Sequence, residues 1–141
     1  MSGIRHFVTA AAGLIACSLF AFGGGTVQAK VDFDTFSAEQ QQWFWDQLND
    51  YAQFDAFLRF CGHDPNFEQR MQAAARECVT DQAIQKVRSV YRTRVVREMK
   101  KNRPGICTAP DGAALIPRME KTVNQAVRDV ESACRTCAFC R

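Results

Sequence analysis

Three cysteines stand close to the C-terminal end of the sequence at a spacing of three residues: Cys134, Cys137 and Cys140, in the stretch CRTCAFCR. Thiolates in a C-x2-C-x2-C run can bind an iron–sulfur cluster, and zinc or copper(I) can be held by such thiolates together with a histidine such as His63. A Cys134–Cys137 pair could also act as a redox centre. The third possibility is that all three belong to a structural disulfide framework.

The residues around these cysteines favour the disulfide framework. The x3-C-P continuation of the ferredoxin run does not follow Cys140. Reactive C-x-x-C pairs lie at helix N-termini, where the helix dipole favours the thiolate, whereas we expect Cys134 and Cys137 near a helix C-terminus. Ala138 stands where c-type haem attachment needs a histidine. We therefore expect no metal and no cofactor, and we keep a thiol-based redox or metal-binding protein as the alternative.

The N-terminal segment predicts export. A basic start at Arg5 precedes an apolar run over residues 7–22, and Val27 and Ala29 provide the small-residue pattern of a cleavage site before Lys30. We expect a cleaved signal peptide, 1–29, followed by a single domain, 30–141, that is periplasmic or secreted and has no transmembrane span after cleavage. The stretch LIAC ending at Cys17 leaves a lipoprotein as the alternative.

Cleavage would remove Cys17 and leave six of the seven cysteines, an even number that predicts disulfides in a small exported domain. We expect each of the three C-terminal cysteines to pair with one of the other three, which would tie the last helix to the rest of the domain. The six are Cys61, Cys78, Cys107, Cys134, Cys137 and Cys140.

Helical spacing of apolar residues runs through the whole domain, and no sustained alternation predicts strands. We expect four helices: about 38–61 behind a Ser37–Gln40 capping box, one opening at Asp64-Pro65, one from a Thr80 cap to about 102, and one opening at Pro117. The segment 103–116 is then the long loop. The predicted fold class is all-α, a small disulfide-stapled bundle of about four helices with antiparallel neighbours.

Charge is segregated along the chain, whose net charge is +3. Residues 30–64 carry seven acidic and two basic side chains, and residues 65–141 carry eight and fifteen. The basic density peaks over residues 86–103, on the side of the third predicted helix opposite its apolar stripe. This face is either simply solvated or binds an anionic surface or an acidic protein. The candidate binding residues are Arg88, Arg92, Arg94, Arg97, Lys100 and Lys101.

The first predicted helix carries aromatic side chains around much of its circumference. Either the helix is central and covered on several sides, or the aromatic side chains form an exposed patch for a partner or for self-association. The candidates for such a patch are Trp43, Trp45, Phe57 and Phe60.

These patterns predict a non-enzymatic binding protein. His63 is the only histidine in 30–141, which leaves histidine-assisted catalysis a single candidate. The expected partner is a protein or an anionic surface of the cell envelope, bound by the basic face, the aromatic face or both. Export disfavours nucleic acid as a partner.

Overall fold

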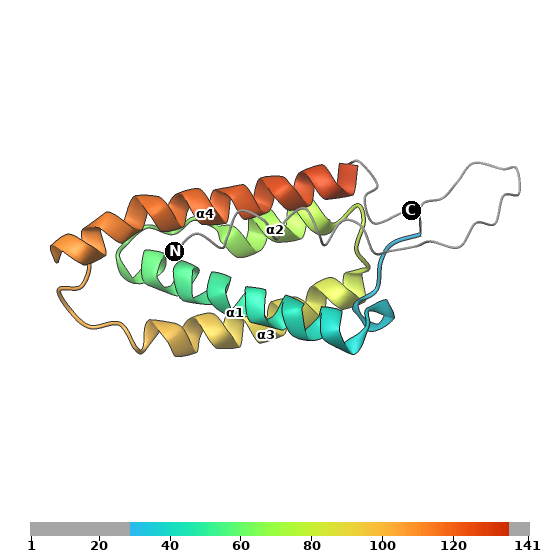
Figure 1. Ribbon diagram of the computed structural model, residues 1–141, viewed down its shortest axis with the longest axis horizontal. Coiled ribbons are helices and arrows are strands. Elements are labelled where there is room, and N and C mark those ends of the chain that lie inside the picture. Colours follow the sequence, from blue (N-terminus) through green and yellow to red (C-terminus); the bar gives the residue numbers. More distant parts are fainter. Residues whose placement is uncertain (1–28, 136–141) are drawn as a thin grey trace, which may run out of the picture.

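The computed structural model describes residues 29–135, and these form a small all-α bundle (Figure 1). This confirms the fold class expected from the sequence. Residues 1–28 of the predicted signal peptide, which include Cys17, lie outside the described residues, as do Cys137 and Cys140. The helices are α1 (Ala38–Phe60), α2 (Phe67–Ala75), α3 (Asp81–Met99) and α4 (Pro110–Arg135), and a 3-10 turn, η2 (Phe33–Thr35), precedes α1.

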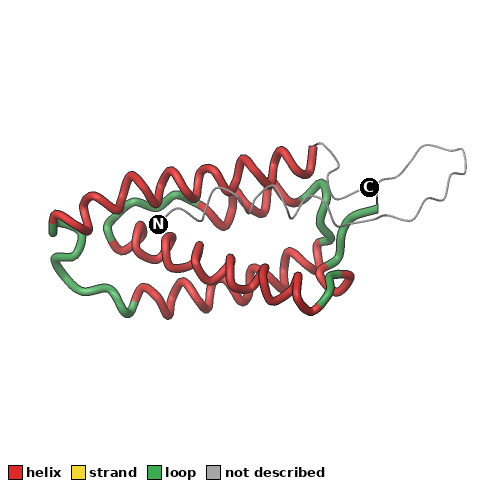
Figure 2. The backbone as a smooth tube through the Cα atoms, in the orientation of Figure 1, coloured by secondary structure: helices red, strands yellow, loops and turns green. Residues whose placement is uncertain are grey.

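β structure is limited to a single isolated bridge in the described part of the chain, and Figure 2 draws no strand there. The bridge joins Val31 to Val79 and places the segment before η2 beside the α2–α3 connection. None of the helices within 29–135 combines the length and the apolarity that a membrane span requires.

The four helices of the described residues pack mainly as two pairs. α1 lies along α3, α2 lies along α4, and a smaller contact between α1 and α4 joins the pairs. The chain direction reverses from each helix to the next, as the colours of Figure 1 show. Consecutive helices are therefore antiparallel, as predicted, whereas the two most extensive contacts join helices that run parallel and are not consecutive.

The core lies between the two pairs and includes side chains from all four helices. Leu58 of α1 and Val123 of α4 have no exposed surface, and Phe67 packs against the rings of Tyr51 and Tyr91. The buried core residues are Ala52, Ala56, Leu58, Phe67, Tyr91, Val95, Val123, Ala126 and Val127.

Both ends of α1 follow the sequence signals. The Ser37 side chain accepts a hydrogen bond from the backbone N–H of Gln40, and the Gln40 side chain accepts one from the backbone N–H of Ser37. At the C-terminus, Gly62 has a left-handed φ of 80°, and the next residue's N–H donates to the Leu58 carbonyl. This is a Schellman motif, which glycine adopts without the steric penalty of a Cβ.

The predicted start of α2 is wrong by two residues. Asp64 does not cap a helix that opens at Pro65. Its carboxylate accepts from the backbone N–H of Asn66 instead, and Asn66 has a left-handed φ of 49°. A residue in that conformation cannot continue a right-handed helix, so α2 begins at Phe67. The Thr80 cap of α3 is present as predicted, with the Ala83 N–H as donor.

The predicted start of α4 is also wrong, because the helix begins at Pro110 and contains Pro117. Pro110 occupies the first helical position, and the Ala113 N–H donates to the Ala109 carbonyl at 2.8 Å. Pro117 lacks the N–H that would bond the Ala113 carbonyl, but both residues are exposed, so water can serve that carbonyl. The loop between α3 and α4 therefore covers 100–109.

Within residues 29–135, two disulfides staple the helices, and only one of them follows the predicted scheme. Cys78, just after α2, pairs with Cys134 near the end of α4, as one of the three C-terminal cysteines was expected to do. Cys61 pairs instead with Cys107 in the α3–α4 loop, so the rule that each C-terminal cysteine takes one of the other three is wrong. The end of α1 and the loop meet at the same end of the bundle, which puts these two cysteines within reach of each other.

Candidate functional site

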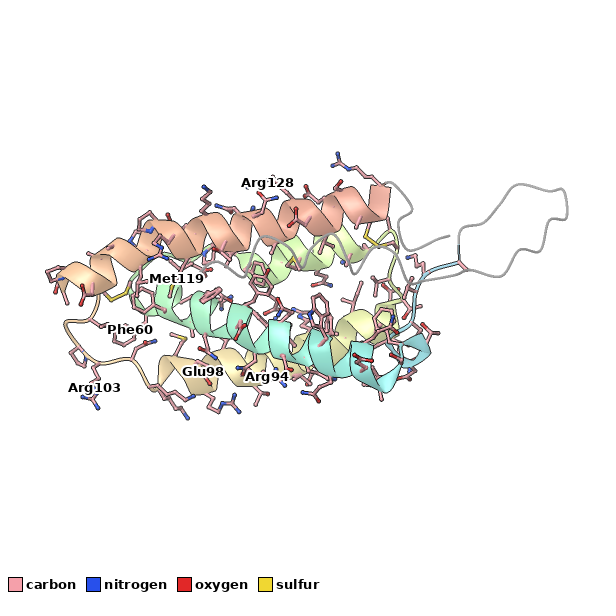
Figure 3. The ribbon with its side chains drawn as sticks, viewed as in Figure 1. Phe60, Arg94, Glu98, Arg103, Met119 and Arg128 are labelled. Carbon is pink, nitrogen blue, oxygen red and sulfur yellow. A yellow bond between two sulfur atoms is a disulfide. The ribbon has the colours of Figure 1, made fainter. Side chains whose placement is uncertain are left out.

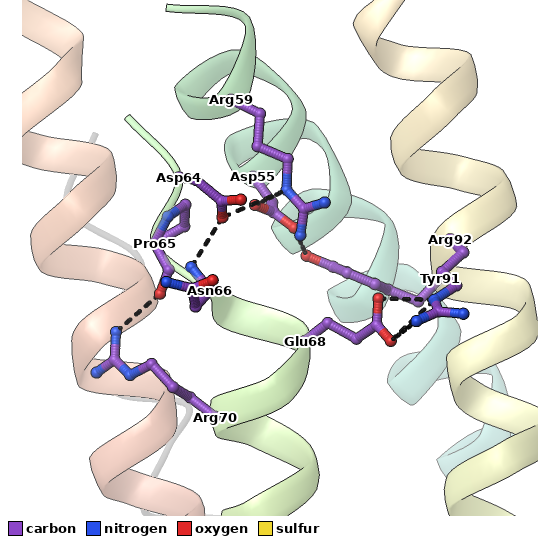
Figure 4. Close-up of polar contacts among 9 residues, drawn as sticks. All are labelled: Asp55, Arg59, Asp64, Pro65, Asn66, Glu68, Arg70, Tyr91 and Arg92. Atoms are coloured by element: carbon purple, nitrogen blue, oxygen red, sulfur yellow. Dashed lines mark hydrogen bonds and ion pairs between the residues drawn. The ribbon is translucent and has the colours of Figure 1, made fainter. Parts of the chain in front are cut away.

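The first half of the basic stretch on α3 is used to hold the fold together. Arg88 and Arg92 both donate to Glu68 of α2. The Arg92 Nη2 lies 2.9 Å from Glu68 Oε1, and Figure 4 shows this pair of Arg92 and Glu68. Lys86 pairs with Asp34 of η2 at 2.9 Å. These cations therefore bind α3 to neighbouring elements, a use that the sequence of α3 alone could not reveal.

Glu68 is the centre of the α2–α3 contact. Its side chain is only 9% exposed, and burial alone would raise its pKa. The hydrogen bonds from Arg92 and Arg88 outweigh burial and hold the Glu68 pKa below its ordinary value. The carboxylate is thus ionised near neutral pH and takes up part of the charge of the two arginines.

Arg94 of α3 binds to α1. Its Nη1 donates to the Trp45 carbonyl at 2.6 Å, and its guanidinium lies 5.6 Å from the centre of the Trp45 ring. A guanidinium at this distance from an indole is attracted by the ring's negative face. Arg94 is half-buried in this position and belongs to the α1–α3 contact.

The second half of the basic stretch, at the C-terminal end of α3, presents its charge to solvent. Residues 97–103, which we call the basic end of α3, contain four cations and one carboxylate. Lys101 and Arg97 donate to Glu98 at 2.7 and 3.1 Å, and their side chains remain 63% and 59% exposed. Lys100 and Arg103 are exposed and make no ion pair within the described residues.

Two local effects keep this cluster charged. Hydrogen bonding from Lys101, with a further bond from Arg97, lowers the pKa of Glu98 despite the opposing effect of burial, so Glu98 stays ionised. The C-terminal end of a helix also carries partial negative charge, which favours cations there. The basic end of α3 therefore keeps a local excess of three positive charges, four cations against Glu98.

A cleft opens beside the basic end of α3, between α1, α3 and α4. Its volume is about 200 Å³. Its apolar wall comes from α1 and α4, and its polar rim includes Glu98 and Lys101; in Figure 3, Glu98 lies below α1 and Met119 above it. The lining residues are Gln53, Phe54, Phe57, Glu98, Lys101, Asn102 and Met119.

The four aromatic candidates of α1 do not share one exposed surface. Phe57 is buried, and Trp45 packs against Phe33 of η2 and its own neighbour Phe44, with ring centres 4.9 and 5.3 Å apart. Phe60 is half-buried, and only Trp43 is strongly exposed, at 47%. Most of the aromatic excess therefore serves packing around a central helix.

A buried polar network centred on Asp55 of α1 was not predicted from the sequence. Asp55 has no exposed surface, and it accepts hydrogen bonds from the Tyr91 hydroxyl at 2.7 Å and from Arg59 Nε at 2.8 Å (Figure 4). Arg59 also lies 3.7 Å from Asp64 at the turn after α1. Asp55 lies within a largely apolar stretch, YAQFDAFL, and this is the signal in the sequence that points to a buried acid.

The thiol and metal hypotheses find no support in the described residues. Cys134 is bonded to Cys78, so in this structure it is not paired with Cys137. No group of three potential metal ligands among histidine, cysteine and acidic residues occurs within 29–135. His63 is exposed, with its Nδ1 3.1 Å from Glu120 of α4.

Comparison with protein-family models, curated proteins and solved structures finds no match for this chain. Inferences about its function therefore depend on its own residues and their geometry.

Proposed function

We propose that this is an exported, non-enzymatic binding protein that recognises an anionic partner through the basic end of α3. One observation carries the proposal: residues 97–103 carry four exposed cations, of which only Arg97 and Lys101 pair with a carboxylate within residues 29–135, and both share Glu98. The cations of the first half of α3 are engaged with acids or aromatic rings of neighbouring elements. At the end of α3, Arg97 and Lys101 share one carboxylate, and Lys100 and Arg103 make no ion pair within residues 29–135, so most of the charge there is not neutralised by the fold.

Export is supported by the chemistry of the cysteines. The disulfides Cys61–Cys107 and Cys78–Cys134 fit an oxidising compartment, because cytosolic thiols are kept reduced. The apolar N-terminal run with its small-residue cleavage pattern agrees with this, and the periplasm or the secreted space is the location that we propose.

The proposal is tested by reversing charge at the basic end of α3. The double variant Lys100→Glu with Arg103→Glu changes two exposed residues that make no ion pair within 29–135, so the bundle should fold normally. We expect it to bind anionic vesicles and poly-glutamate at least about tenfold more weakly than the unmodified protein at low salt. Unmodified binding should also fall steeply between about 0.01 and 0.15 M salt, as the Debye length shrinks from roughly 30 to 8 Å.

The matched control is Lys121→Glu with Arg128→Glu, which produces the same change in net charge on α4. Figure 3 shows Arg128 on the side of the bundle opposite Arg103. This control should keep most of the binding. Equal losses in the two double variants would mean that only net charge matters and would refute a localised site; undiminished binding by the Lys100 and Arg103 variant would refute the basic end of α3 as the site.

A further inference from the structure

The cleft beside the basic end of α3 provides a second, apolar element of recognition next to the charge. Phe57 forms part of its wall and is 7% exposed, while Phe54 and Met119 are half-buried and pack against the core. Gln53 of α1 is exposed at the rim. A ligand group that entered here would replace water on aromatic and thioether surface, which is favourable for an apolar group.

The volume limits what can enter. Pockets that enclose a drug-sized ligand measure about 300–1,000 Å³, so a cleft of about 200 Å³ is too small for one. It has room for about seven waters at roughly 30 Å³ each, which is of the order of one large apolar side chain. A long acyl chain would extend well beyond the cleft.

The cations at the rim of the cleft favour a ligand that carries acidic groups next to its apolar group. Lys101 lines the cleft just after α3 ends, and Arg97 lies in the last turn of α3. Glu98, the carboxylate at the rim, is already hydrogen-bonded by both of them. A ligand that carries carboxylates beside its apolar group would therefore meet exposed cations with spare donors.

We propose that the partner is an acidic protein segment that inserts one aromatic or large aliphatic side chain into this cleft and places flanking carboxylates against the basic end of α3. This inference rests on the proposed function and narrows its partner to a peptide. It follows a common pattern of protein interfaces, in which one apolar anchor fills a pocket and polar groups surround it.

The test uses the purified oxidised protein and blocked pentapeptides as probes. The first peptide has a central phenylalanine between two pairs of glutamates, the second replaces the phenylalanine with serine, and the third replaces the glutamates with lysines. Affinities are measured by calorimetry, and the methyl groups of Met119 and Met71 are followed by NMR. Met119 lines the cleft, whereas Met71 packs against the core from α2 and serves as an internal control.

We expect the phenylalanine–glutamate peptide to bind and to shift the Met119 methyl signal while leaving that of Met71 in place. The serine peptide should bind at least about tenfold more weakly, because it cannot bury an apolar side chain. The lysine peptide should not bind measurably. The rim substitution Gln53→Trp, at an exposed position, should weaken the phenylalanine peptide without affecting the serine peptide.

Each other outcome overturns a defined part of the inference. Equal affinities for the phenylalanine and serine peptides would refute the cleft and leave the basic end of α3 as the site. Binding of anionic vesicles without binding of any peptide would refute the acidic segment as partner and leave the proposed function in place. Binding of the lysine peptide as tightly as the first would refute the role of the cations in both proposals.

Discussion

The buried hydrogen bond between Tyr91 and Asp55 allows a sharp test of how the bundle is stabilised. The change Tyr91→Phe removes the hydroxyl that donates to Asp55 at 2.7 Å and keeps the ring that packs against Phe67. Asp55 has no exposed surface, so water cannot replace the lost donor without a rearrangement. A hydrogen bond to a charged group contributes about 1.5–3 kcal/mol to stability, and leaving a buried acceptor short of a donor adds to its loss.

Because Arg59 still donates to Asp55, we expect the free energy of unfolding to fall by about 2 kcal/mol. For a domain of this size, that corresponds to a melting temperature lower by roughly 8 °C. Urea unfolding followed by circular dichroism measures the change directly, and the dependence on urea concentration should stay the same. A change in this dependence, the m-value, would indicate that the substitution alters the unfolded or the native ensemble.

The chain has a matched control, because Tyr51 is its only other tyrosine. The Tyr51 ring packs against Phe54 and Phe67, and its hydroxyl makes no hydrogen bond within residues 29–135. The change Tyr51→Phe should therefore cost less than about 0.5 kcal/mol. Equal effects of the two tyrosine changes would refute the assignment of the stability to the Asp55 hydrogen bond.

Three further predictions concern pH and the disulfides. Burial, with added effects of the Asp55 charge and hydrogen bond, raises the pKa of Tyr91 above its ordinary value of 10.0. The protonated Tyr91 hydroxyl therefore stabilises the folded state below pH 10, and this contribution is lost as the pH rises beyond 10. In the Tyr51→Phe protein, whose only tyrosine is Tyr91, phenolate absorbance at 295 nm should appear only together with unfolding. Because the pKa of Glu68 is lowered in the folded state, its carboxylate stabilises the fold above about pH 4.5, and this contribution is lost as the pH falls through the folded-state pKa. Glu68→Gln should therefore lower the free energy of unfolding by about 1 kcal/mol at pH 7 and by much less at pH 3, as measured by urea unfolding. Replacing both cysteines of Cys61–Cys107 or of Cys78–Cys134 by alanine should cost about 4 kcal/mol in each case, because the closed loops span 46 and 56 residues; calorimetric melting that shows no loss for either pair would contradict the chain-entropy argument.

Several features of the fold could be read from local sequence signals. The Ser37 capping box, the glycine that ends α1 and the Thr80 cap each depend on residues within one turn of helix, and all three are present. The failures came where a local signal competes with a neighbouring one. Pro117 resembles a helix start by itself, but Pro110 supplies an earlier one and the exposed Pro117 is tolerated inside the helix.

The close approach at Gly112 shows a constraint that no local signal reveals. A Cβ at this position would lie 1.7 Å from the Ile106 carbonyl oxygen, so the first turn of α4 needs glycine where the loop folds back on it. The contact depends on the path of the loop, which the Cys61–Cys107 disulfide holds against the end of α1. The sequence shows only a glycine two residues after Pro110, and the folded chain explains why no side chain fits there.

By itself, the sequence determined the helical class, the even number of cysteines in 30–141 and the concentration of positive charge on one helix. The tertiary structure decided which of those charges are free. Glu68 and Asp34 lie outside α3 in the sequence, yet they pair with its first half, while Glu98 is the one carboxylate within residues 29–135 that pairs with the cations at its end. The reason is physical: the spacing of residues fixes which side of a helix a charge occupies, but its net effect on a partner depends on the opposite charges and the burial that other elements bring to it.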